Sequence, residues 1–244
     1  MDLRLDLRVP GGGHVRTVWT PASGEPRGWA WLQHGFARTG SSLAGLAGAL
    51  AARGVCVVRP ELRSLTPRRS MHDRAYLTAV TLTLAAAVDE GAVSARGVPV
   101  SGPWLGIGHS AGAAVVVHAA AVLASRPVDI AGLILIDPVD TVGGLLAGSL
   151  SEIPGVPIVA FACPPSRCNR QGQTARRLTV RADVIPLPGL SHADPERIPG
   201  DLRVTSVPPP GRAVSAICGR GGSPEAVIDL GERVVNAAGT LVTL

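Results

Sequence analysis

The chain has 244 residues, a length that fits one large domain spanning 1–244 and that can bury a substantial core. Hydrophobic residues make up 46% and aromatic residues only 3%, so we expect a folded core built from Ala, Val, Leu and Ile. The net charge is +5, and all 23 basic residues are Arg, scattered along the chain and at most paired. Because no basic run and few rings for base stacking are present, we expect no nucleic-acid partner.

The start of the chain resembles a strand and not an export signal. Residues 1–9 alternate charged and apolar side chains. The longest apolar stretch, Ala111 to Ala124, is interrupted by His118 and is too short to cross a bilayer. We therefore expect no stable membrane insertion, and a cytoplasmic protein, or a secreted one if a signal has been removed. The oligomeric state is left open.

Short apolar runs alternate with helical stretches from the first residues onward. The first half is expected to form strands at Leu3 to Val9, Val15 to Trp19 and Trp29 to Gln33, a helix at Ser42 to Arg53 capped by Ser41 or Ser42, a strand at Val55 to Val58, and a helix at Met71 to Asp89. The first two strands, separated by Gly11-Gly12-Gly13, are expected to be antiparallel.

The second half continues the same alternation. It is expected to form strands at Trp104 to Gly108, Ile130 to Ile136, Pro157 to Ala162 and Val184 to Leu187, with helices at Ala111 to Ala124 and Glu225 to Ala238. Such an alternation predicts an α/β fold with a mostly parallel sheet covered on both faces. Ligands and chemistry in these sheets lie at the carboxyl ends of the strands. That edge holds His34, Ser110, Asp137 and the loop that begins at Cys163.

Gly108-His109-Ser110-Ala111-Gly112 lies between an expected strand and an Ala-rich helix. A tight strand-to-helix turn crowds the backbone, so the serine needs small neighbours, and the turn lifts its Oγ to the edge of the sheet. The helix N-terminus that follows favours developing negative charge. Ser110 is therefore the candidate nucleophile. A glycine-rich turn that only packs a helix against a strand is the alternative interpretation.

Two backbone amides are the candidate donors for an oxyanion. Ala111 directly follows the nucleophile, and Phe36 lies in His34-Gly35-Phe36 after the third strand. Preorganised donors of this kind are worth roughly 3 kcal/mol each in the transition state. An ordinary strand-ending turn is the alternative for His34-Gly35.

The candidate general base is His192, the one histidine of six that follows the last expected strand. His109 lies within the Ser110 turn and His118 inside a buried helix, so both are expected to pack in the core. His14 and His72 belong to early loops.

The candidate acid is Asp137, at the carboxyl end of the strand expected beside that of Ser110. An aspartate there can orient the imidazole and stabilise the imidazolium. Asp140 is the reserve candidate, whereas Asp194 is too close to His192 along the chain. The alternative role for Asp137 is a turn carboxylate, which Asp-Pro often supplies.

The chain has four cysteines, an even number that permits disulfides without requiring them. Cys163 and Cys168 lie in one proline-rich loop, where both a disulfide between them and free thiols remain open. No CxxC motif or paired histidine spacing accompanies them, so we expect no metal site.

Five segments resemble a known superfamily: His34 to Phe36, Ala51 to Pro60, Gly108 to Gly112, Ile136 to Asp140 and Ala216 to Gly219. They are similar to the α/β-hydrolases, over nearly the whole chain, and within them to the chlorophyllase and polyester-hydrolase (cutinase-like) branch. Chlorophyllases place the acid in this Asp-Pro-Val-Asp segment, and lipases of the pancreatic type place it in an Asp-Pro after this strand. The resemblance thus implies Asp137 as the acid.

The chain departs from both groups in the branch. Chlorophyllases usually have Arg-Gly-Gly after the serine, where this chain has Ala111-Gly112-Ala113. Cutinase-like enzymes carry the acid one strand later, and the loop 163–170 has no carboxylate.

These residues predict a serine hydrolase that cleaves small-molecule or polymeric carboxylic esters through an acyl-enzyme, without metal or organic cofactor. A thioesterase, an acyltransferase or a cofactor-free haloperoxidase on the same residues is the alternative. A hydrolase fold retained as a binding protein is less favoured. The stretches Glu61 to His72 and Thr141 to Pro154 are expected to form static apolar walls over the site.

Overall fold

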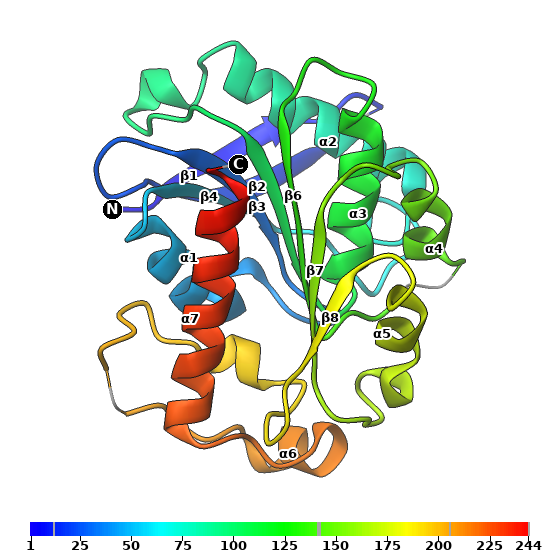
Figure 1. Cartoon of the computed structure of the whole chain (residues 1–244). Helices are drawn as coiled ribbons and strands as arrows, with labels where there is room; N and C mark the ends of the chain where they lie inside the picture. Colours follow the sequence, from blue (N-terminus) through cyan, green and yellow to red (C-terminus); the bar gives the residue numbers. More distant parts are fainter. Residues whose placement is uncertain (12, 141–142, 205, 244) are drawn as a thin grey trace.

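The protein is described from a computed structural model that covers residues 1–11, 13–140, 143–204 and 206–243. Gly12 of the expected glycine turn, and Thr141 and Val142 of the second expected wall, lie outside the described residues. Eight strands form one sheet in the order β1-β2-β4-β3-β5-β6-β7-β8, with helices on both faces (Figure 1).

The sheet is parallel except at its N-terminal edge. Its strands are β1 (Leu3–Arg8), β2 (His14–Thr20), β3 (Gly28–Gln33), β4 (Val55–Pro60), β5 (Trp104–His109), β6 (Ile130–Ile136), β7 (Ile158–Ala162) and β8 (Asp183–Pro186). β1 pairs antiparallel with β2, and β2 pairs antiparallel with β4, whereas every later pair is parallel. The expected α/β architecture and the antiparallel start are confirmed.

Two layers of helices cover the sheet. The helices are α1 (Ala44–Ala51), α2 (Arg74–Asp89), α3 (Gly112–Leu123), α4 (Leu145–Leu150), α5 (Gln173–Leu178), α6 (Arg212–Cys218) and α7 (Pro224–Leu241). α1 and α7 pack on one face, and α2, α3, α4 and α5 pack on the other (Figure 1). The continuous apolar runs of β3, β4 and β5 are buried along their whole length, as expected for central strands covered on both faces.

Helix starts and short helices differ from the expectations. The serine cap expected for the first helix is wrong. A 3-10 turn at Gly40–Leu43 precedes α1, and the N-cap of α1 is Leu43, which makes no side-chain capping hydrogen bond. The hydroxyl of Ser42 donates to the carbonyl of Thr39 instead. α4, α5 and α6 were not predicted, because each is only six or seven residues long and carries no clear apolar periodicity.

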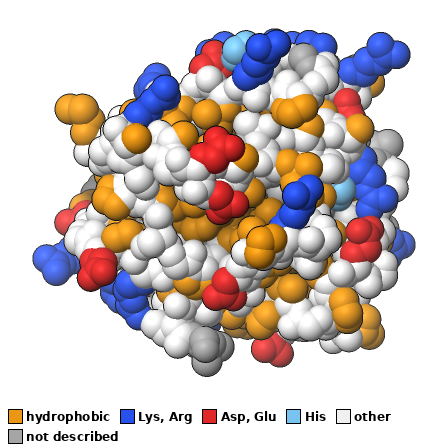
Figure 2. All heavy atoms as spheres, turned by 90° about the horizontal axis from the view of Figure 1, so that it is seen from above, with side chains coloured by type: hydrophobic (Ala, Val, Ile, Leu, Met, Phe, Trp, Pro, Cys, Tyr) orange, Lys and Arg blue, Asp and Glu red, His pale blue; other side chains and the backbone are white. Residues whose placement is uncertain are grey.

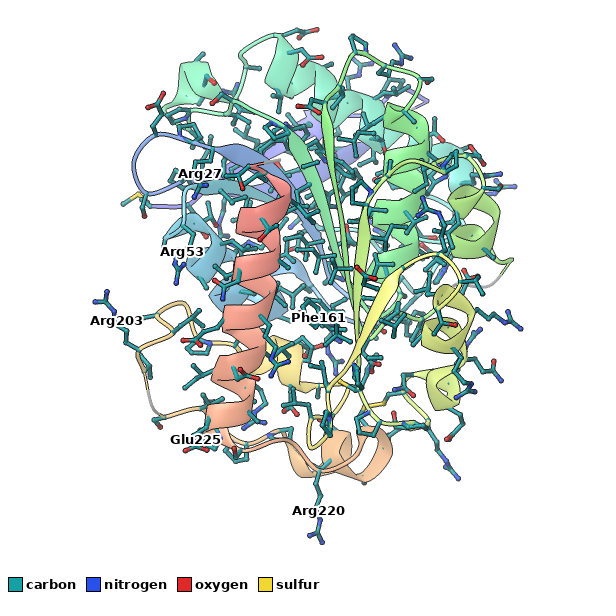
Figure 3. The ribbon with its side chains drawn as sticks, in the orientation of Figure 1. Arg27, Arg53, Phe161, Arg203, Arg220 and Glu225 are labelled. Carbon is teal, nitrogen blue, oxygen red and sulfur yellow. A yellow bond between two sulfur atoms is a disulfide. The ribbon has the colours of Figure 1, made fainter. Side chains whose placement is uncertain are left out.

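Apolar side chains fill the layers on both sides of the sheet, and several arginines point outward. The buried Phe161 side chain of β7 lies in the same layer as the apolar face of α7, whereas Arg203 and Arg220 extend away from the molecule (Figure 3). Viewed from above, basic side chains are scattered around the edge of the face and separated by acidic and apolar ones (Figure 2). Within the described ranges, no helix is both long and apolar enough to cross a membrane.

Candidate active site

Ser110 lies at the carboxyl end of β5, in a strained turn that leads directly into α3. Its φ is +57°, in the left-handed region that side-chain-bearing residues rarely adopt. A Cβ on Gly108 would lie 2.5 Å from the carbonyl oxygen of Gly112, and a Cβ on Gly112 would lie 2.4 Å from that of Gln33. Both flanking glycines are therefore required for this turn to form. The sequence argument about crowding has a direct steric basis in these contacts.

The loop after β3 passes over the Ser110 side chain. A Cβ on Gly35 would lie 2.8 Å from the Cβ of Ser110, so only glycine allows this approach. Among the hydrogen bonds of the described residues, none uses the amide of Phe36 or of Ala111 as donor. Within the described residues, neither expected oxyanion donor has a hydrogen-bond partner; Ala111 directly follows Ser110, and Phe36 directly follows Gly35.

The expected wall at Glu61 to His72 contacts this loop. The amide of Ala37 donates to the Ser64 hydroxyl over 2.8 Å, and the rings of Phe36 and His72 lie 5.9 Å apart, centroid to centroid. The Phe36 side chain is half exposed and comes one residue after the glycine that approaches Ser110. The stretch therefore contacts the loop that passes over Ser110.

His192 follows β8 and forms a hydrogen-bonded chain with the other two candidates. Its Nε2 lies 2.9 Å from the Oγ of Ser110, and its Nδ1 lies 2.6 Å from the Oδ2 of Asp137. The nearly buried hydroxyl and carboxylate are bridged by an imidazole that keeps 11% of its side chain exposed. Serine, histidine and aspartate from three separate loops thus meet in the order that a nucleophile, a base and an orienting acid require.

Asp137 ends β6 and is held by several donors. Its φ of +43° turns the carboxylate towards the β7 loop, where its Oδ1 accepts the Cys163 amide over 3.1 Å. The Asn169 side-chain amide donates to both carboxylate oxygens, at 3.2 and 3.1 Å. These donors satisfy the oxygens of a carboxylate that is buried away from water. It is placed as an acceptor for His192 rather than as a free turn residue.

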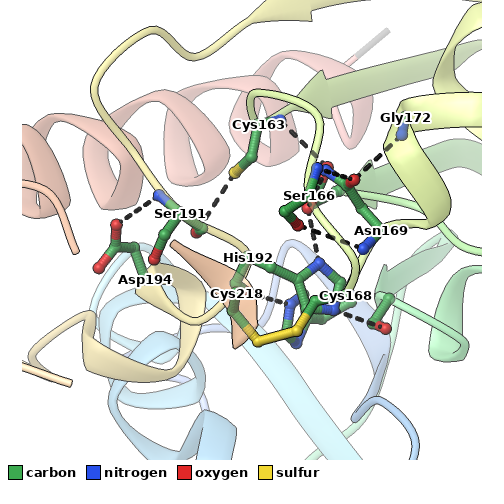
Figure 4. A network of polar contacts seen from close by, with 12 residues as sticks. Cys163, Ser166, Cys168, Asn169, Gly172, Ser191, His192, Asp194 and Cys218 are labelled. Atoms are coloured by element: carbon green, nitrogen blue, oxygen red, sulfur yellow. Dashed lines mark hydrogen bonds and ion pairs between the residues drawn. A yellow bond between two sulfur atoms is a disulfide. The ribbon is translucent and has the colours of Figure 1, made fainter. Parts of the chain in front are cut away.

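The other two aspartates near the site have structural partners. The Asp140 carboxylate accepts from the amides of Leu146 and Ala147 at the start of α4. Asp194 accepts from the amides of Ser191 and Gly222 and forms an ion pair with Arg197. Figure 4 shows Asp194 on the side of Ser191 away from His192.

Two further histidines lie in the core, as expected. His109 is fully buried, and its Nε2 donates to the His192 carbonyl over 2.8 Å. Burial, together with the nearby His192, holds the pKa of His109 well below its usual range. His118 of α3 lies 3.0 Å from the Thr78 hydroxyl and 3.2 Å from the Ser149 hydroxyl, with a pKa lowered mainly by burial. Neither imidazole contacts Ser110.

An ion pair that the sequence did not reveal joins the loop after β3 to the segment after β8. The Nε of Arg38 donates to both carboxylate oxygens of Glu196, at 2.8 and 2.9 Å. Arg38 comes two residues after Phe36, and Glu196 comes four residues after His192. Because the two residues are 158 positions apart, their pairing depends on the folded sheet and could not be predicted from local pattern.

Of the two possibilities left open for Cys163 and Cys168, the disulfide between them is not formed. Cys168 bonds to Cys218, at the end of α6, and Cys163 is a buried free thiol that donates to the Ser191 carbonyl (Figure 4). Two consecutive prolines after Cys163 restrict the backbone to extended conformations. The two cysteines of the loop are thereby directed to different partners. Burial raises the pKa of both free cysteines, that of Cys56 to about 12.

No metal centre is formed by the described residues: among them, no group of three or more His, Cys, Asp or Glu side chains is arranged to hold an ion. The candidate site consists instead of one hydroxyl, one imidazole, one carboxylate and backbone amides.

Comparison with known proteins identifies the fold. No protein-family model matches the chain, and no curated protein matches its sequence. Among solved structures, a lipase in its open form matches with a TM-score of 0.63 and 12% identity over 100% of both chains. An esterase domain from a Rhodothermus marinus protein matches with a TM-score of 0.59 and 16% identity, covering 98% of each chain. A thioesterase domain from the curacin biosynthetic pathway matches with a TM-score of 0.52 and 16% identity, covering 97% of this chain and 99% of the other.

This chain has the α/β-hydrolase fold. At these identities the similarity establishes the architecture alone. The expected fold class is confirmed, whereas the resemblance to the chlorophyllase and cutinase-like branch stays a prediction.

Proposed function

We propose that this protein is a serine hydrolase that cleaves carboxylic esters, with Ser110 as nucleophile, His192 as general base and Asp137 as the orienting acid. The hydrogen-bonded chain from Ser110 Oγ through His192 to Asp137 carries the proposal, because both of its links are shorter than 3 Å. Nucleophilic serine chemistry needs this contact between the hydroxyl and a base that is itself oriented.

The reaction proceeds in two acyl-transfer steps. Ser110 Oγ attacks the ester carbonyl carbon while its proton passes to His192 Nε2, and the amides of Phe36 and Ala111 donate to the oxyanion. The imidazolium then gives that proton to the leaving alkoxide, so an alcohol departs and an acyl-Ser110 remains. Water attacks the acyl-enzyme with the same histidine as base, which releases the carboxylic acid and restores Ser110.

Asp137 acts on His192 throughout the cycle. Its Oδ2 accepts from Nδ1, which leaves Nε2 unprotonated and facing Ser110 in the resting enzyme. When Nε2 takes up the serine proton, the carboxylate stabilises the resulting positive charge. Asp140 does not take this role, because its oxygens accept from the first amides of α4.

A thioesterase is the second candidate, supported by the similarity of the fold to the thioesterase domain. The same residues serve both reactions, and the two substrate classes differ in their leaving group, an alcohol or a thiol. Polyester, lipid and chlorophyll esters are the substrates that the resemblance to the chlorophyllase and polyester-hydrolase branch implies. The arrangement of Ser110 and His192 supports each of these equally, so the acyl and alcohol portions are assigned by assay.

Turnover of p-nitrophenyl esters of increasing acyl length by the purified chain tests the proposal, with Ser110→Ala expected to abolish it. Ser41→Ala is a matched control, since Ser41 is an exposed serine of the turn before α1. Acyl-thioester, polyester-film and chlorophyll substrates run in parallel identify the preferred leaving group. Equal turnover by wild type and Ser110→Ala would contradict the proposal.

A further inference from the structure

The loop after β7 carries a buried side-chain amide, Asn169, that contacts Asp137. Asn169 is fully buried and lies next to Cys168 in this loop, and β7 itself pairs with β6, the strand that precedes Asp137. Burial of a carboxamide away from water is costly unless its donors and acceptor are all engaged. The partners of Asn169 therefore indicate what it does.

All of the polar atoms of the Asn169 side chain are engaged. Its Oδ1 accepts from the amides of Ser166 and Gly172, at 2.8 and 3.0 Å. Its Nδ2 donates to the two Asp137 oxygens and to the Pro164 carbonyl, the latter over 3.0 Å (Figure 4). The opposite amide orientation would set an NH₂ group against two N–H donors and an oxygen against a carboxylate. The network thus admits one orientation, with donors towards Asp137.

We propose that Asn169 is a positioning residue of the hydrolase: it fixes the Asp137 carboxylate in the rotamer that accepts from His192. The inference rests on the proposed function. Among the residues that the structure describes, Asp137 has three donors, namely the His192 imidazole, the Cys163 amide and the Asn169 side chain. Only the Asn169 side chain contacts both oxygens, so it restrains rotation of the carboxylate as well as its position.

The ionisable groups near Asp137 do not restrain both of its carboxylate oxygens, as the Asn169 side chain does. The ionisable groups placed against the carboxylate are His192 and the buried Cys163 thiol. The pKa of that thiol is raised by burial and by the Asp137 and Asp194 carboxylates, so it stays neutral and adds no charge. The backbone at Asn169 is also restrained covalently, because the preceding residue, Cys168, forms a disulfide with Cys218.

The substitution Asn169→Asp removes the NH₂ group that donates to Asp137 and keeps the oxygen that holds the loop. An aspartate keeps one oxygen for the Ser166 and Gly172 amides but replaces the NH₂ group by an oxygen that faces Asp137. Two carboxylates in contact raise the pKa of the introduced carboxyl. When that carboxyl is protonated it can donate to Asp137 as the amide does, and when it ionises it repels Asp137.

The pH dependence of the variant is therefore the decisive readout. At pH 8 we expect kcat for a p-nitrophenyl ester to fall on the order of 100-fold, less than the loss of about 10⁴ from removing the acid itself. The ratio of variant to wild-type kcat should rise steadily between pH 8 and pH 5.5. KM should stay within about threefold, because Asn169 does not contact substrate in this account. Asn236→Asp, on the exposed surface of α7, is the matched control and should leave the ratio near one.

The fold of the variant is verified independently by the Cys168–Cys218 disulfide, which is counted as two unreactive cysteines out of four in denatured protein. If the Asn169→Asp variant does not form this disulfide, the Asn169→Ala variant is tested instead. The alanine variant is expected to move the acidic limb of the kcat/KM profile to higher pH, since a carboxylate relieved of a donor stabilises the imidazolium more strongly.

A folded variant whose kcat ratio is near one, or is low but independent of pH, would overturn the role of Asn169. For the alanine variant, an unmoved acidic limb would do the same. A wild-type chain that neither hydrolyses esters nor is labelled at Ser110 would instead overturn the proposed function itself.

Discussion

Breaking the Cys168–Cys218 disulfide should lower both the thermal stability and the activity of this protein. The bond closes a loop between cysteines 50 residues apart, and that loop contains β8 and His192. In the chain-entropy account, opening a loop of this length costs roughly 4 kcal/mol of stability at 25 °C. For a chain of this size we therefore expect the melting temperature to fall by roughly 8 to 16 °C.

The activity should fall because the disulfide joins the segments around the acid and the base. Cys168 precedes Asn169, which holds Asp137, and Gly219 after Cys218 lies beside Ser191. We expect the reduced protein to lose activity at temperatures well below its melting point.

Melting curves and ester turnover with and without a phosphine reductant provide the assay. The denatured chain should expose two reactive thiols when oxidised and four when reduced, since Cys56 and Cys163 are free. Cys168→Ser/Cys218→Ser should match the reduced wild type and should not respond to reductant. Oxidised and reduced forms that melt within about 2 °C of each other, at the expected thiol counts, would refute the reasoning from loop closure.

Three further predictions test other parts of the structure. Asp137→Asn should reduce kcat by about 10⁴, and Asp140→Asn by less than about tenfold, because the second carboxylate caps α4; equal losses in steady-state assays would reject this assignment. Gly112→Ala should cost roughly 3 kcal/mol in urea unfolding, since its Cβ would meet backbone oxygen at 2.4 Å. The control is Gly239→Ala in α7, where the added Cβ would have no neighbour within 4 Å, so the change should be neutral or stabilising. A Gly112→Ala variant that is tolerated equally well would contradict the crowding argument. The lowered pKa of buried His109 means that the unfolded chain binds a proton that the folded chain does not, so stability present above about pH 6.5 is lost as pH falls. Urea titrations at pH 7.5 and 5.5 should show a smaller pH dependence for His109→Gln than for wild type, by at most about 1.4 kcal/mol per pH unit, and identical dependences would exclude His109 as a contributor.

The strands were predictable because each depends on a local pattern. β3 to β7 are continuous apolar runs bounded by polar or glycine-containing loops, and such runs indicate covered parallel strands whatever their neighbours are. The short helices α4 and α5 were missed because packing on the sheet, rather than their own periodicity, stabilises them.

Residues of the candidate site that depend on local pattern could be predicted, whereas those that depend on contacts between distant loops could not. Ser110 was predictable because its turn constrains residues within two positions, and His192 because it follows the last strand. Asn169, Arg38 and Glu196 were not, since their roles depend on contacts between distant loops. The sequence offered one signal for Asn169, namely that the loop after β7 has no carboxylate. Asn169 lies in that loop and donates to Asp137.

Labelling with a fluorophosphonate tests the central claim most directly. The reagent reacts with a serine only when a neighbouring base activates its hydroxyl, and Ser110 is the hydroxyl placed 2.9 Å from His192 Nε2. Peptide mass spectrometry should find one phosphonyl group per chain, on Ser110, and His192→Ala should abolish it. Stoichiometric labelling of another residue, or undiminished labelling of the Ser110→Ala variant, would contradict the account.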